Sequence, residues 1–378
     1  MIIDIEELIK KPEDADASEL RYMLIASSPA NMRKISGFTG EGLVCLMENE
    51  RFIVTDSRYT IAAKNEIKDF EVYEMSGGYM RTVLKIAAQK SGILSEGTKI
   101  IIGFEDTKMT MSSFNQMKML SLINFPKCNI SFRPLEAKLD AFRRVKTVEE
   151  IEIITRAEKI GDMAFDKIME YFKKSRASGK KITEREISAR IEFYMKELGA
   201  DKTSFDTIVA SGLHSAMPHA VPTDKVIEDG DFVTMDFGCM VEGYCSDMTR
   251  TIVYGRASDK QKKIYNLVLR AQQHAIDNLH AGMTGSEIDE LARKIIRDEG
   301  YGDYFGHSLG HSVGLEIHEN PNFSVNCNDI IEPDMVITVE PGIYIENFGG
   351  VRIEDVVVVK EDGCVDITES SKGLIEIV

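Results

Sequence analysis

Four carboxylates and one imidazole in the last two-fifths of the chain have the residue types of a two-metal site. They are Asp236, Asp247, His311, Glu340 and Glu354. Oxygen and imidazole ligands suit divalent ions such as Mn²⁺, and a pair of ions roughly 3.5–4 Å apart is a common catalyst of hydrolysis. Without cations, four clustered acids would repel one another strongly. The set therefore predicts a metallohydrolase.

The spacing of the four acids indicates two chain reversals. Asp236 and Asp247 flank residues 240–243, where a reversal would set the two aspartates opposite each other on adjacent strands. Glu340 and Glu354 are similarly placed around a Gly-Gly pair. Directly opposed residues bring their Cβ atoms within about 4.5–5.5 Å of each other. Two such hairpins would supply a cage of carboxylates.

Two of the acids end apolar segments that have the character of strands. Residues 232–238 and 335–342 each contain a hydrophobic run that ends in an acid followed by Gly or Pro-Gly. Acidic residues near turns are usually solvated, but these interrupt apolar strands, where a carboxylate must be paired, hydrogen-bonded or metal-bound. Arg250 and Arg352 are the main cations nearby. Metal ions are the better partners for the whole set.

The elements around these residues predict an α/β (α+β) chain of two domains. Residues 1–130 alternate short apolar strands with amphipathic segments, which is typical of an α/β unit. A charged, irregular stretch follows, and Thr147 then opens a long amphipathic segment with a capping box. We place the boundary near residue 140, between a smaller domain of residues 1–140 and a catalytic domain of residues 141–378.

The second domain contains a faint internal repeat. Thr183 and Thr284 each begin a Thr-x-x-Glu helix start, followed by apolar residues at helical spacing. Each predicted helix is followed by a hairpin that carries candidate ligands. The repeat is far longer than the roughly 20–50 residues of a solenoid unit. We therefore interpret the domain as two duplicated halves that clamp one site between them.

Composition narrows the classes of partner and compartment. A chain of 378 residues with 43% hydrophobic content exceeds what one core usually organises. The net charge of −16 argues against nucleic acid as a partner, and no stretch approaches the roughly 18 apolar residues of a membrane span. Residues 1–7 are acidic where a signal peptide would be basic. We expect a cytoplasmic protein with no nucleic-acid or membrane partner.

The six cysteines are too sparse for a disulfide scaffold and form no Cys-x-x-Cys pair. Cys239 and Cys245 lie between Asp236 and Asp247, where they are candidates for soft zinc ligands. Small buried fillers are the commoner use of a free cysteine. We expect reduced thiols that take no part in the metal site.

The histidines gather around the candidate ligands. The chain has only seven, and none precedes His214. His307, His311 and His318 lie in a run in which glycine recurs at every fourth residue, which suits close backbone approach more than a regular helix. We expect these three imidazoles to face a common cleft. His214 receives no role, because a single histidine is more often structural than catalytic.

Five short motifs follow one another through the last part of the chain. They are Pro218-His219, Asp236-Phe237-Gly238 with residues 243–250, residues 306–311 continued through His318-Glu319, Glu340-Pro341-Gly342, and Arg352-Ile353-Glu354-Asp355. In type and order they resemble the pita-bread metallopeptidases, and within them the Xaa-Pro peptidases, aminopeptidase P and prolidase. Residues 31–39 and 56–59 are similar to the amino-terminal domain of the same enzymes. The resemblance implies a C-terminal pita-bread domain of two pseudo-repeated halves, preceded by a smaller creatinase-like α/β domain.

The resemblance also implies a role for each candidate ligand. Asp247 and Glu354 match ligands that bridge two metal ions, and Asp236 matches a ligand of one ion only. His311 and Glu340 match ligands of the other ion, and Glu340 also matches the residue that moves a proton from the attacking water to the leaving nitrogen. The implied cofactors are two divalent ions, with Mn²⁺ favoured by the oxygen-rich set and Co²⁺ or Zn²⁺ as alternatives.

Four further residues match positions that contact the substrate. His219 and His318 match residues that stabilise the tetrahedral intermediate. His307 and Arg352 match residues that line the pocket beyond the scissile bond. For Arg352, pairing with a neighbouring carboxylate is an equally good interpretation, because arginine commonly forms such forks.

The predicted reaction is hydrolysis of a short peptide before a proline at its second position, by attack of a metal-bridging water. We favour an Xaa-Pro aminopeptidase, with an Xaa-Pro dipeptidase (prolidase) as the alternative. A methionine aminopeptidase would not need an additional domain of about 140 residues, creatinase works without metal, and a non-catalytic binding protein of this fold should have lost a ligand. The family also implies a homodimer.

Overall fold

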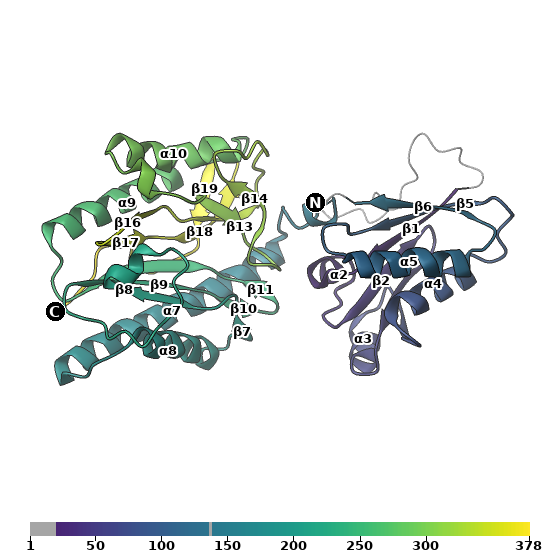
Figure 1. Cartoon of the computed structure of the whole chain (residues 1–378), viewed down its shortest axis with the longest axis horizontal. Helices are drawn as coiled ribbons and strands as arrows, with labels where there is room; N and C mark the ends of the chain where they lie inside the picture. Colours follow the sequence, from purple (N-terminus) through teal and green to yellow (C-terminus); the bar gives the residue numbers. More distant parts are fainter. Residues whose placement is uncertain (1–19, 136–137) are drawn as a thin grey trace. The chain divides into compact units, whose positions relative to one another are not determined.

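The chain divides between Arg143 and Arg144 into two units of structure, near the boundary that the sequence predicts. The computed structural model, shown in Figure 1, describes residues 20–135 and 138–378. Residues 1–7, on which the signal-peptide expectation depends, lie outside that part of the chain. Within the described ranges, no helix has the length and apolar character needed to cross a membrane.

The first unit is a six-stranded mixed sheet with helices on both faces. Its strands are β1 (Leu20–Ala26), β2 (Gly42–Met47), β3 (Arg51–Thr55), β4 (Glu71–Glu74), β5 (Lys99–Phe104) and β6 (Asn129–Pro134). Its described helices are α2 (Pro29–Ser36), α3 (Thr60–Glu66), α4 (Tyr79–Lys90), α5 (Met111–Asn124) and the short α6 (Lys138–Ala141). The strand order is β4-β3-β2-β1-β5-β6, with β1 antiparallel to β2 and parallel to β5.

Alternation along the central strand explains why the first unit has two layers of helices. In β1, Met23 and Ile25 join the apolar cluster that includes α4 and α5, whereas Leu24 and Ala26 join the cluster that includes α2 and α3. Successive side chains of a strand point to opposite faces, so a strand that is apolar throughout must be covered on both. The predicted α/β unit is confirmed.

The second unit contains four long helices and several short sheets. Its helices are α7 (Val148–Ser178), α8 (Glu184–Glu197), α9 (Asp259–Asn278) and α10 (Gly285–Asp298), with short 3₁₀ turns η1 (Gly212–Ala216) and η2 (Gly302–Tyr304). Its strands are β7 (Lys202–Thr203), β8 (Ile208–Ser211), β9 (Asp231–Phe237), β10 (Cys239–Val241), β11 (Tyr244–Cys245), β12 (Met248–Tyr254), β13 (Gly310–Ser312), β14 (Glu319–Phe323), β15 (Val336–Val339), β16 (Gly342–Ile345), β17 (Gly349–Arg352), β18 (Asp355–Lys360), β19 (Gly363–Asp366) and β20 (Glu376–Ile377).

Two similar halves make up the second unit, as the repeat predicts. One apolar cluster unites α7 and α8 with the sheet β20-β12-β9-β8, and another unites α9 and α10 with the sheet β14-β13-β15-β18-β19. Figure 1 shows the two helix pairs on opposite sides of the strands. Thr183 and Thr284 cap α8 and α10, each accepting a hydrogen bond from the backbone three residues later, and Thr147 caps α7 with a complete capping box. The predicted helix starts are confirmed.

Candidate metal centre

A cavity of about 690 Å³ in the second unit is lined by every residue that the sequence assigned to the site. These residues are His219, Asp236, Asp247, His307, His311, His318, Glu340, Arg352 and Glu354. They come from both halves of the unit, because β9 and the β11–β12 link supply the aspartates and the strands after α10 supply the rest of the ligands. The expectation that three of the imidazoles share a cleft is confirmed.

The two aspartates are not directly opposed, and this part of the sequence prediction was wrong. Thr249 is the cross-strand partner of Asp236. The chain reverses at Glu242 and Gly243, whose φ angles of 46° and 73° are those of a tight two-residue turn. That turn places Asp247 two positions from the partner of Asp236, on the same face of the ladder. Such diagonal neighbours are about 7–8 Å apart at the backbone, which leaves room between the carboxylates.

The two glutamates do face each other, as predicted. The ladder of β15 with β18 and the ladder of β16 with β17 keep the same register on either side of them. Pro341 separates the two ladders at this point, and a proline cannot donate a ladder hydrogen bond. Glu340 and Glu354 therefore stand opposite each other in a gap between two hairpin segments.

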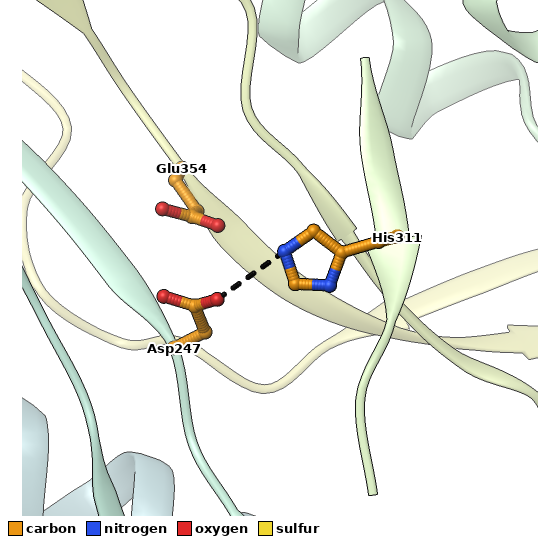
Figure 2. Close-up of side chains that lie close together, drawn as sticks. All are labelled: Asp247, His311 and Glu354. Atoms are coloured by element: carbon orange, nitrogen blue, oxygen red, sulfur yellow. Dashed lines mark ion pairs between the residues drawn. The ribbon is translucent and has the colours of Figure 1, made fainter. Parts of the chain in front are cut away.

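Asp247, His311 and Glu354 point toward one another from three separate segments (Figure 2). Each offers one ligand atom, and these atoms all lie within 4.8 Å of one another. His311 Nε2 is 3.5 Å from an Asp247 oxygen and 3.4 Å from an oxygen of Glu340. The structure thus brings a fourth predicted ligand to the edge of the same cluster.

His311 presents a neutral nitrogen to these acids. Its Nδ1 lies 3.2 Å from the Ser312 carbonyl oxygen, which can only accept, so Nδ1 carries the proton and Nε2 carries the lone pair. Burial, together with the neighbouring His318, lowers the pKa of His311 to about 4. Gly310 permits this arrangement, because a Cβ at that position would lie 1.8 Å from the Thr338 carbonyl oxygen.

The acids lack enough positive charge among their neighbours. Burial first, and then the nearby carboxylates, raise the pKa values of Asp247 and Glu354 well above the ordinary range, and burial raises the pKa of Glu340 to about 8. Within the described residues, Arg352 is the one lysine or arginine that forms an ion pair with any of the four acids, at 2.5 Å from Asp236. One guanidinium cannot balance four carboxylates.

The donor set therefore fits divalent cations. Asp236 Oδ1 and Glu354 Oε1 are buried and have no hydrogen-bond donor within the described ranges. A buried carboxylate oxygen without a donor is costly, and a divalent ion in contact with it would remove that cost. Four carboxylates and one neutral imidazole are also the ligand types that hard divalent ions prefer.

Arg352 belongs to a buried network beside the cavity, and this network includes a residue that the sequence did not single out. Its Nη2 donates to Asp236, and its Nη1 donates at 2.7 Å to the hydroxyl of Tyr344. The same hydroxyl lies 3.0 Å from His307 Nε2, and His307 Nδ1 lies 2.8 Å from the carbonyl oxygen of Ser308. Arg352 thus lines the cavity and also pairs with a carboxylate, whereas its contact with a substrate stays a prediction.

His219 and His318 differ from the other two imidazoles because both are exposed at the cavity. The His318 ring lies 4.4 Å from the His311 ring. No hydrogen bond to another described residue engages either ring, so their nitrogens remain available to a bound substrate. His214 is different, since its Nδ1 lies 2.9 Å from the buried Glu184.

The cysteines behave as expected from the sequence. All six are free. Cys239 and Cys245 are buried away from the cavity lining, and burial raises the pKa of each thiol to about 12. Buried, protonated thiols are unreactive, and the absence of Cys239 and Cys245 from the metal site stays a prediction.

Comparisons with known proteins match both units. A family model described as metallopeptidase family M24 matches residues 152–361, and one described as creatinase/prolidase N-terminal domain matches residues 10–145. An Xaa-Pro dipeptidase of Pyrococcus horikoshii is 37% identical over 98% of this chain and 99% of its own. The structure titled Xaa-Pro dipeptidase from Bacillus anthracis is 40% identical with a TM-score of 0.84, over 94% of this chain and 95% of that one. An X-Pro aminopeptidase from Thermotoga maritima is 38% identical with a TM-score of 0.83, over 94% and 97% of the two chains.

A two-halved unit that encloses acids and imidazoles in one cavity, together with these matches, defines a metallopeptidase of the pita-bread fold. The chain belongs to metallopeptidase family M24, with a creatinase-like domain preceding the catalytic domain. The family and the fold class that the sequence motifs predicted are confirmed.

Proposed function

We propose that this peptidase is an Xaa-Pro dipeptidase, a prolidase. The observation that carries the proposal is the convergence of all five candidate ligands, three further histidines and Arg352 on one cavity. From the sequence motifs we expected an aminopeptidase. Relatives named Xaa-Pro dipeptidase that match nearly the whole chain support the alternative better.

The proposed cofactors are two divalent ions, with Mn²⁺ as the first candidate. They would be held by Asp236, Asp247, His311, Glu340 and Glu354. When bound, such ions supply a nucleophilic water at neutral pH and stabilise the oxygen of the scissile carbonyl. The unpartnered oxygens of Asp236 and Glu354 support this assignment.

The remaining steps fall to the side chains around the ligands. Glu340 takes the proton of the attacking water and delivers it to the proline nitrogen, which bears no hydrogen of its own in the peptide bond. His318, beside His311, donates to the carbonyl oxygen as it gains negative charge, and His219, which also lines the cavity, contacts the substrate.

His307 offers a substrate contact without charge in the pocket beyond the scissile bond. Both ring nitrogens of His307 are engaged, by Ser308 and by Tyr344, so this imidazole presents carbon atoms to the substrate. Phe305 packs edge-on against the His307 ring at 5.1 Å between centroids. The uncharged ring of His307, held in place by buried Phe305, suits contact with the pyrrolidine ring of proline.

A hydrolysis assay separates the candidate substrates. Metal-stripped protein is incubated with Ala-Pro, Ala-Pro-Ala and Ala-Ala, with and without added Mn²⁺, and released alanine is measured. Mn²⁺-dependent cleavage of Ala-Pro alone is the expected result. Equal cleavage of Ala-Ala would remove the proline preference, and cleavage of no peptide by metal-loaded protein would overturn the proposal.

An Xaa-Pro aminopeptidase is the second candidate, because the Thermotoga maritima structure of that name matches this chain almost as well as the dipeptidase does. Cleavage of Ala-Pro-Ala would support it, since a dipeptidase must close its cleft directly after proline. The homodimer and the cytoplasmic location stay predictions.

A further inference from the structure

An isolated backbone bridge joins Thr249 of one half of the catalytic unit to Glu354 of the other. Thr249 belongs to β12 of the first half, and Glu354 lies between β17 and β18 of the second. The Glu354 amide donates to the Thr249 carbonyl oxygen at 3.1 Å. A proposed bridging ligand from one half is therefore fixed to a strand of the other half.

Thr249 holds the side chain of this ligand. Its hydroxyl oxygen accepts a hydrogen bond from Arg352 Nε at 3.0 Å, so its single proton is directed to Glu354 Oε2, at 2.6 Å. This contact leaves Oε1 as the buried oxygen without a donor. The hydroxyl of Thr249 thus fixes the rotation of the Glu354 carboxylate.

Arg250 holds the main chain of the same ligand. Its Nη1 donates to the carbonyl oxygens of Glu354 at 2.6 Å and of Thr249 at 3.0 Å. Its Nη2 donates at 2.7 Å to both Asp355 Oδ1 and the Ser370 carbonyl oxygen. The side chains of Arg250 and Asp355 are 1% and 0% exposed, so this fork is fully enclosed by protein.

The ligand of the first half is backed by the same C-terminal segment. The Asp247 amide donates to Glu158 Oε1 at 2.8 Å, and Thr368 donates to Glu158 Oε2 at 3.3 Å. Thr368 lies two residues before Ser370, which accepts from Arg250. One short segment therefore supports Asp247 and Glu354 from behind.

We propose that Thr249 and Arg250 are positioning residues for metal binding, which set the orientation of Glu354 across the join between the two halves. The inference rests on the proposed function, because it assumes that Glu354 binds an ion. Neither residue lines the cavity, so neither is a ligand. Outer partners that orient a metal ligand typically change metal affinity by about 10–100-fold when they are removed.

The experiment measures Mn²⁺ affinity and stoichiometry by calorimetric titration of metal-stripped protein. Thr249→Val removes the hydroxyl and keeps the shape of the side chain, whereas Thr249→Ser keeps the hydroxyl. Arg250→Lys keeps the charge but cannot form the fork onto a carboxylate and three carbonyls. The thermal midpoint of each metal-stripped variant reports any loss of structure separately.

Arg293→Lys is the matched control. Arg293 forms the same kind of fork in the same unit, onto Asp289 at 2.5 and 2.9 Å and onto the carbonyl oxygens of Phe305 at 2.9 Å and His307 at 2.7 Å. None of these groups is a proposed ligand. Arg293→Lys should lower the thermal midpoint but change the Mn²⁺ affinity by no more than about threefold. Removal of a residue that orients a metal ligand should change that affinity by roughly tenfold or more.

The expected result is an affinity about 10–100-fold weaker in Thr249→Val and Arg250→Lys, with Thr249→Ser close to the unaltered protein. Unchanged Mn²⁺ affinity in Thr249→Val would overturn the inference. If Arg250→Lys does not fold, Thr249→Val alone tests the inference. Failure of the unaltered protein to bind Mn²⁺ would overturn the metal site and the inference together. Mn²⁺ binding without cleavage of Ala-Pro would overturn only the proposed substrate.

Discussion

Replacing Tyr344 with Phe tests the network that connects Arg352 to His307. The hydroxyl of Tyr344 accepts from Arg352 Nη1 at 2.7 Å and lies 3.0 Å from His307 Nε2. Burial raises the pKa of this tyrosine to about 12, so the hydroxyl keeps its proton and donates it to the imidazole. The substitution deletes both hydrogen bonds and leaves the ring in place.

The size of the effect follows from the two partners. A hydrogen bond to a charged group contributes about 1.5–3 kcal/mol and one between neutral groups about 1 kcal/mol. Arg352 Nη1 retains a weaker contact with the Pro218 carbonyl oxygen at 3.3 Å, which places the loss at the lower end. We expect the free energy of unfolding to fall by about 2.5 kcal/mol. For a unit of this size, that corresponds to a fall in Tm of about 5–10 °C.

Thermal unfolding followed by circular dichroism, with metal removed by a chelator, measures this change. Metal must be absent because a bound ion would add its own stabilisation. The transition of the catalytic unit is identified as the one that added Mn²⁺ raises. Tyr304→Phe is the matched control, since Tyr304 is 41% exposed and its loss should cost no more than about 0.5 kcal/mol. Equal Tm values for the two variants would refute the network.

The remaining predictions concern the ligand set and the thiols. Glu340→Gln removes a ligand charge and the proton carrier, so Ala-Pro turnover should fall by at least about 10²-fold with an unchanged circular dichroism spectrum; near-normal turnover would contradict the proposed mechanism. Replacing Cys239 and Cys245 with Ala should leave the Mn²⁺ content unchanged in elemental analysis, because both thiols are buried away from the cavity. Loss of metal from that double variant would show that the thiols are ligands.

The sequence was sufficient for those parts of the site that depend on neighbours along the chain. Apolar runs that end in Asp236 and Glu340 predicted buried acids at strand ends, and both line the cavity. The prediction that Glu340 and Glu354 stand opposite each other was also correct, because a Gly-Gly pair marks the nearby chain reversal. Asp236 and Asp247 were misplaced by two positions, since residues 240–243 do not show which pair forms the turn.

Contacts between segments that are distant in the chain could not be predicted from local sequence patterns. Tyr344 sits in an apolar strand and is indistinguishable there from a core aromatic residue; its position two residues from Gly342, the cross-strand partner of Arg352, was the only available signal. Thr249 lay within a recognised motif, but its contact with Glu354 depends on how the two halves meet. The preference for proline came from the family resemblance alone, since no local pattern encodes a pyrrolidine pocket.

The origin of the ligands in two halves has a consequence for how the protein is made. Contacts that define the site join residues 105 positions apart at Thr249 and Glu354, 116 apart at Asp236 and Arg352, and 210 apart at Glu158 and Thr368. Closing such long loops lowers the conformational entropy of the chain before the contacts that they bring together can form. The site should therefore assemble late in folding, and a growing chain on the ribosome has no complete ion site until synthesis has passed residue 354. Ion loading is then confined to molecules in which both halves have already folded together.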